Sequence, residues 1–124
     1  MVTPSAGSVV LVSFPFSDLS ASKLRPAVVI ASAGRDDWVL CQVTSNPYAD
    51  ANAIEISDVD FASGSLQRVS FVRPGKLFTS NASLMKAEVG HLTDSALTKV
   101  LDAVVALLKK TGGEHTTNES SATS

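Results

Sequence analysis

The hydrophobic and polar positions divide the chain into two parts with different periods. Up to about residue 92, apolar residues form short runs rich in Val, Ile and Phe, separated by polar or Pro/Gly-containing stretches. Such runs are typical of β-strands. From residue 93 onward, apolar positions recur at i, i+3, i+4 and i+7, which is typical of an amphipathic helix. The pattern therefore predicts a set of short strands followed by one helix.

The strand part is expected to hold five or six strands, at residues 8–14, 26–32, 38–45, 53–56, 65–79 and 88–92. Pro26 is acceptable at the first position of a strand, where a missing N–H costs little. Pro74 and Gly75 interrupt the longest candidate and indicate a turn or bulge within it. The stretch 57–64 is expected to be a polar connection.

The helix is defined by its apolar stripe: Leu97, Val100, Leu101, Val104, Leu107 and Leu108. Thr93 or Asp94 can cap its start, and Gly112 is the expected stop. We therefore expect one domain over residues 1–111 and a polar, disordered tail over 112–124.

Short strands joined by turns, with no helices between them, favour an antiparallel sheet over a parallel one. The expected fold class is mainly β (α+β). It is a compact antiparallel β-barrel with the C-terminal helix packed on it.

Composition limits the functional classes. The 124 residues include 10 basic and 12 acidic side chains, a net charge of -2, so any contact with nucleic acid must come from a local patch. The single cysteine, Cys41, excludes an internal disulfide and favours a reducing compartment. No signal peptide or membrane-length apolar run is apparent, which predicts a cytoplasmic protein with no membrane association.

The usual cofactor and metal signatures are missing from the sequence. The two histidines, His91 and His115, form no Cys/His cluster with zinc spacing. There is no P-loop and no dinucleotide-binding fingerprint. A Ser-His-Asp triad stays open because its members can be far apart in sequence, but the nucleophile-elbow motif is absent. We expect neither a metal nor a cofactor.

Three segments, in this order and spacing, carry a family resemblance. They are residues 14–18 with 23–30 (FPFSD, then KLRPAVVI), residues 41–45 (CQVTS) and residues 71–79 (FVRPGKLFT). Together they resemble the MazF/PemK family of toxins from type II toxin–antitoxin pairs, over about residues 8–108. The loop followed by Leu-Arg-Pro and a strand is the most specific part.

The resemblance implies an SH3-like (CcdB/PemK-like) barrel with a C-terminal helix, a homodimer, and a cognate antitoxin that blocks the RNA groove. It implies metal-free cleavage of single-stranded RNA at short sequences through attack of the 2′-OH, often leaving a 2′,3′-cyclic phosphate. The family's catalytic arginine and threonine fall on Arg25 and Thr44. The planar donor fork of an arginine matches phosphate oxygens, whereas its pKa above about 12 makes it a poor general base.

Further RNA contacts are expected from the same segments: Lys23, Ser45, Asn46, Arg73, Lys76 and Phe16. Phe16 is a candidate stacking platform for a base. Each of these also has an ordinary interpretation as a surface or core residue. Some relatives carry an acidic residue two positions after the equivalent of Arg73, where this chain has Gly75, so a mechanism that needs that carboxylate is in doubt.

Two other functions remain open from the sequence. The related CcdB toxins share the barrel and block DNA gyrase, but the helix here lacks the expected C-terminal tryptophan. A barrel that has lost catalysis and acts only as a binding module is the other alternative, which Gly75 keeps open.

Overall fold

The computed structural model describes residues 2–13, 24–47 and 50–113, with side chains as far as residue 110. The predicted contacts Lys23 and Phe16 therefore lie outside the described residues. The elements are β1 (Ser8–Ser13), β2 (Leu24–Gly34), β3 (Asp37–Thr44), β4 (Ile54–Ile56), β5 (Phe61–Gly64), β6 (Ser70–Asn81), β7 (Met85–Leu92) and α1 (Asp94–Gly113). Two single 3₁₀ turns, Asp58–Asp60 and Ala82–Leu84, precede β5 and β7.

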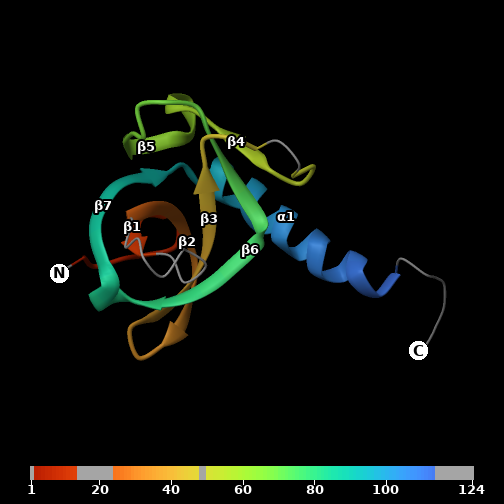
Figure 1. The fold of residues 1–124 in the computed structure, drawn as a ribbon, viewed down its shortest axis with the longest axis horizontal. Coiled ribbons are helices and arrows are strands. Elements are labelled where there is room, and N and C mark those ends of the chain that lie inside the picture. Colours follow the sequence, from red (N-terminus) through yellow and green to blue (C-terminus); the bar gives the residue numbers. More distant parts are fainter. Residues whose placement is uncertain (1, 14–23, 48–49, 114–124) are drawn as a thin grey trace.

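The strands form one seven-stranded sheet in the order β4-β6-β3-β2-β1-β7-β5, and each described pairing is antiparallel. The sheet curls into a partly open barrel, and α1 runs along one side of it (Figure 1). The predicted fold class, an antiparallel barrel with a C-terminal helix, is confirmed.

The irregularity expected at Pro74 and Gly75 is a bulge inside one continuous strand. Across the β3–β6 ladder, Cys41 faces Leu77, yet Val43 faces Val72, so β6 carries three more residues than β3 over this interval. Pro74 is buried within the bulge. A proline is tolerated here because a bulge already interrupts the hydrogen-bond ladder.

The polar connection expected over 57–64 was wrong in part, because its second half is strand β5. Among the described strands this edge strand pairs only with β7, and three of its four residues are exposed, which removes the apolar alternation that marks a strand in sequence. Gly64 has φ +71°, and a Cβ there would collide with the carbonyl oxygen of Val89. The close approach of these two backbones requires glycine.

Helix α1 begins as predicted, and Thr93 is its cap: the Thr93 hydroxyl oxygen accepts a 3.1 Å hydrogen bond from the Ala96 N–H. Its buried stripe is Ala96, Val100 and Val104, with Leu97, Leu101 and Leu107 half-buried beside it. Leu108 was wrongly included in the core stripe, since 60% of it is exposed.

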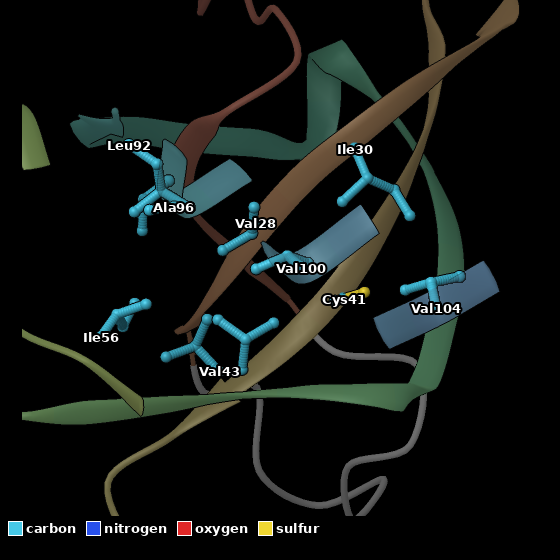
Figure 2. Packing of buried hydrophobic residues seen from close by; sticks show 11 residues of the cluster. Val28, Ile30, Cys41, Val43, Ile56, Leu92, Ala96, Val100 and Val104 are labelled. Carbon is cyan, nitrogen blue, oxygen red and sulfur yellow. The ribbon is translucent and has the colours of Figure 1, made fainter. Parts of the chain in front are cut away.

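Two apolar clusters use alternate residues of the same strands. In the first, Val28, Cys41 and Val43 on the sheet face Val100 and Val104 of α1 (Figure 2). The second takes the intervening positions, including Ala27, Val29 and Leu40. Burial raises the pKa of the Cys41 thiol to about 12, so this cysteine is an inert core residue.

Replacing Val100 by Ala tests how much the helix contributes to the fold. Val100 is fully buried between α1 and the sheet, so the change should lower the free energy of unfolding by about 2 kcal/mol. Chemical denaturation followed by circular dichroism measures this value. The matched control is Val105→Ala, at a half-exposed position, which should cost less than about 0.5 kcal/mol. Equal losses in both variants would contradict the packing described.

Candidate functional site

Arg25 and Thr44 meet through the pairing of their strands. Arg25 faces Val12 across the β1–β2 ladder, and Ala27 faces Gln42 across the β2–β3 ladder. The same register, continued by two residues, sets Arg25 opposite Thr44. Residues directly opposite each other on antiparallel strands point to the same face. The two predicted catalytic residues are therefore neighbours at one end of the sheet.

A pocket of about 280 Å³ opens at this end of the sheet. Its lining has apolar residues from several elements and a set of polar residues: Leu11, Pro26, Val43 and Leu66, with Arg25, Thr44, Ser45, Arg68 and Ser70. Three of the predicted site residues are thus brought together. A fourth, Asn46, is exposed and directly follows Ser45.

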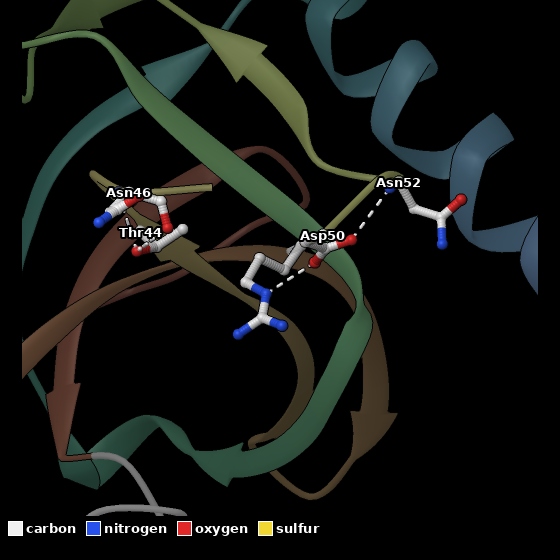
Figure 3. Close-up of polar contacts among 5 residues, drawn as sticks. Thr44, Asn46, Asp50 and Asn52 are labelled. Atoms are coloured by element: carbon white, nitrogen blue, oxygen red, sulfur yellow. Dashed lines mark hydrogen bonds and ion pairs between the residues drawn. The ribbon is translucent and has the colours of Figure 1, made fainter. Parts of the chain in front are cut away.

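The hydroxyl of Thr44 is oriented by a local turn. Its oxygen accepts a 3.1 Å hydrogen bond from the Asn46 N–H, and its proton is directed to the Asn46 carbonyl oxygen 3.3 Å away (Figure 3). The second contact is long for an O–H···O bond, whose usual length is about 2.7–2.8 Å. The oxygen is therefore held firmly while the proton is held weakly, and a ligand oxygen can take that proton as a hydrogen bond.

Arg68 is a pocket residue that the sequence pattern did not single out. The sequence pattern places it in the first part of the strand candidate over 65–79, whereas β6 begins only at Ser70. The preceding residue, Gln67, has φ +63°, a conformation that non-glycine residues rarely adopt. Nothing in the sequence marks that turn, because Gln has no preference for positive φ.

Arg73 lies outside the pocket lining and is held by a carboxylate. Its Nε donates a 2.7 Å hydrogen bond to Oδ2 of Asp50, whose Oδ1 accepts from the Asn52 N–H at 3.0 Å (Figure 3). The hydrogen bond from Arg73, helped by the one from Asn52 and by the positive charge, holds the pKa of Asp50 below its ordinary value despite partial burial. Arg73 therefore has a structural role in this conformation.

Lys76 and Gly75 also lie outside the lining of the pocket. Lys76 is half-buried in β6, and a Cβ at Gly75 would lie 3.5 Å from Cδ2 of Leu107 in α1. Position 75 thus faces the helix, and a carboxylate there would not line this pocket. Gly75 removes no group from the pocket itself.

Within residues 2–13, 24–47 and 50–113, no three His, Cys, Asp or Glu side chains are grouped so that they could hold a metal ion. None of the helices in the described part of the chain is long and apolar enough to cross a membrane.

The ion pair between Asp50 and Arg73 predicts a pH-dependent stability. Because folding lowers the pKa of Asp50, the stabilisation is complete above the unfolded pKa of about 3.9 and is lost as the pH falls through the lower folded pKa. Asp50→Asn should cost about 0.5–1 kcal/mol at pH 7 and progressively less below about pH 4. Thermal unfolding of both proteins between pH 2 and 7 measures this. Asp102→Asn, at an exposed helix position, is the control; a constant deficit down to pH 2 would contradict the prediction.

Known proteins share the sequence pattern and the fold of this chain. The model of the family described as PemK-like, MazF-like toxin of type II toxin–antitoxin system matches residues 5–108. No curated protein sequence matches the chain significantly.

Solved structures share the fold at low sequence identity. An endoribonuclease from Mycobacterial species, in complex with its cognate antitoxin, has a TM-score of 0.64 at 15% identity, over 88% of this chain and 96% of its own. MazF from Deinococcus radiodurans has a TM-score of 0.65 at 19% identity, over 88% and 99%. The Mycobacterium tuberculosis toxin MazF-mt6 has 0.64 at 13%, over 82% and 96%. With the family match across most of its length, the chain belongs to the PemK-like, MazF-like toxins of type II toxin–antitoxin systems.

Proposed function

We propose that this toxin is a metal-independent endoribonuclease that cleaves single-stranded RNA, such as mRNA, at short sequences. The observation that carries the proposal is the pocket at the end of β3, whose lining brings together Arg25 and Thr44 from two neighbouring strands. An RNA phosphate is the ligand that suits a guanidinium and two or more neutral donors.

In the proposed reaction the 2′-oxygen forms a bond to the adjacent phosphorus, and the bond from phosphorus to the 5′-oxygen breaks. The 2′-OH gives its proton to solvent, and the leaving 5′-oxygen takes one up. The products are a 2′,3′-cyclic phosphate and a 5′-hydroxyl. Arg25 donates N–H bonds to a non-bridging phosphate oxygen, and Thr44 donates its O–H, so both stabilise the negative charge that grows on the pentavalent phosphorus.

The remaining predicted contacts take different places in this proposal. Ser45 and Asn46 continue the pocket edge and are proposed to hold the RNA next to the scissile phosphate. Lys23 and Phe16 stay predictions for the segment before β2. Arg73 and Lys76 lie outside the pocket, so any contact they make with RNA would be remote from the cleaved bond.

The partners follow from the relatives. The Mycobacterial endoribonuclease was solved with its cognate antitoxin, and MazF of Deinococcus radiodurans with MazE. We propose a cognate antitoxin and a homodimer for this chain as well, in the cytoplasm, where its RNA substrate is found. The alternative of an inactive binding module is less favoured. Gly75 faces α1, so the lack of a carboxylate at this position leaves the lining of the pocket unchanged.

Arg25→Gln is the direct test of the proposed function. Purified protein is incubated with a mixed-sequence RNA in excess EDTA, and cleavage products are mapped by sequencing. We expect wild-type cleavage and a loss of at least about 100-fold in the variant, the usual cost of removing a preorganised donor. The matched control is Arg35→Gln, which removes the same charge at the β2–β3 turn, at the far end of this ladder. No cleavage of any RNA, or cleavage that EDTA abolishes, would refute the proposal.

A second prediction distinguishes the contribution of the Thr44 hydroxyl to catalysis from that of the shape of its side chain. Thr44→Ser keeps the hydroxyl and should retain most of the activity, whereas Thr44→Val should lower kcat by about tenfold, as expected for one hydrogen bond. Melting temperatures of both variants show whether the turn to Asn46 survives. Equal activity in the two variants would exclude a role for the hydroxyl.

A further inference from the structure

The sheet order places Arg68 across the pocket from Arg25. Strand β3 lies between β2 and β6 and is antiparallel to both, so its end at Thr44 lies beside the starts of its two neighbours. Arg25 is the second residue of β2, and Arg68 lies two residues before β6. Two strand spacings separate the flanking backbones by about 10 Å. Both residues line the same pocket, with Thr44 between them.

The backbone around Arg68 is held in place on both sides. The Ser65 hydroxyl accepts a 2.7 Å hydrogen bond from the Gln67 N–H and donates a 2.6 Å bond to Asp58 Oδ1. On the other side, the buried Ser70 hydroxyl donates to the Arg68 carbonyl oxygen at 3.3 Å. These bonds keep Gln67 at its unfavourable positive φ. A strained residue persists only where its surroundings determine it, which is common at ligand sites.

The guanidinium of Arg68 has no carboxylate partner among the described residues, in contrast to that of Arg73. Asp58 lies close by, lining with Arg68 an adjoining pocket of about 310 Å³, yet its carboxylate accepts a hydrogen bond from Ser65. Arg68 is exposed and borders both pockets. Its side chain is therefore available to a ligand that extends from one pocket into the other.

We propose that Arg68 is a second phosphate-binding catalytic residue of the cleavage pocket, which holds the non-bridging oxygen opposite to the one held by Arg25. The inference rests on the proposed function. That function, as stated above, does not itself require Arg68. A phosphodiester carries one negative charge, and the pentavalent phosphorus formed by 2′-oxygen attack carries a second. Two arginines that line the pocket from either side of Thr44 match that doubled charge, so the contact strengthens in the transition state. Since Arg73 is bound to Asp50, Arg68 is the second arginine that the described pocket offers.

The first experiment measures kcat and KM on one RNA that carries a single cleavage site. Arg68→Gln should lower kcat by about 100-fold with KM changed by less than about threefold, because the contact acts chiefly in the transition state. Arg68→Lys keeps the charge without the planar fork and should recover part of the loss. Arg35→Gln, the control, should leave both constants unchanged. Melting temperatures verify that all variants are folded, as expected for exposed side chains.

The second experiment replaces one non-bridging oxygen of the scissile phosphate by sulfur, using each of the two phosphorothioate isomers separately. Sulfur accepts hydrogen bonds poorly, so each isomer weakens the contact made by one arginine. The ratio of the two cleavage rates should shift in one direction in Arg68→Gln and in the opposite direction in Arg25→Lys.

Each outcome decides the inference. If wild-type protein cleaves RNA and Arg68→Gln behaves like Arg35→Gln, the inference fails while the proposed function stands. A raised KM with unchanged kcat would also overturn it, since Arg68 would then contact RNA only away from the reacting phosphate. The same holds if both arginine variants shift the isomer ratio in one direction. Absence of cleavage by the wild type would refute the proposed function instead.

Discussion

The position of β3 in the centre of the sheet is the constraint on which the rest of the structure depends. It pairs antiparallel with β2 on one side and β6 on the other, and Leu40 and Cys41 are fully buried. A slip of one residue would reverse the face of every side chain on this strand. It would move Leu40 to the face of the cluster beneath α1 and Cys41 to the face of the other cluster, and would separate Thr44 from Arg25. The register that buries the core is therefore the register that assembles the pocket.

Burial on both faces explains why the pocket lies at the end of the strands. Along β2, Val28 contributes to the cluster beneath α1, and Val29 contributes to the cluster on the other face. Neither face has room for a polar site along this stretch, because an unpartnered polar group there would cost about 1–3 kcal/mol. Strand β2 becomes exposed only towards its two ends, as at Arg25, and the exposed Ser45 directly follows the end of β3. The rigid core thus supports polar groups at its rim.

The sequence could predict what depends on period and on local chemistry. Apolar runs gave the strands, the 3.6-residue period gave α1, and Pro74 with Gly75 indicated the bulge in β6. Strand β5 was not predicted, because its exposed position at the edge of the sheet leaves no alternation of apolar and polar residues. Leu108 followed the periodic stripe but lies beyond the part of α1 that the sheet covers. A periodic pattern shows which face of a helix or strand is apolar. It does not show how far the element that packs on that face extends.

The roles of the arginines could not be predicted from sequence, because they depend on which carboxylates the fold brings near them. Arg73 stands in a segment that resembles the family motif, yet Asp50, far from it in sequence, approaches to 2.7 Å. Arg68 stands outside the segments that resemble the family motif, and it borders the pocket directly after the turn at Gln67. A positive charge next to a carboxylate is largely neutralised, whereas one without such a partner contributes its full field to an incoming phosphate. With a net charge of -2 over the whole chain, attraction for RNA has to come from such unneutralised positions. The distribution of carboxylates around the arginines, more than the number of arginines, therefore determines where this protein can hold a phosphate.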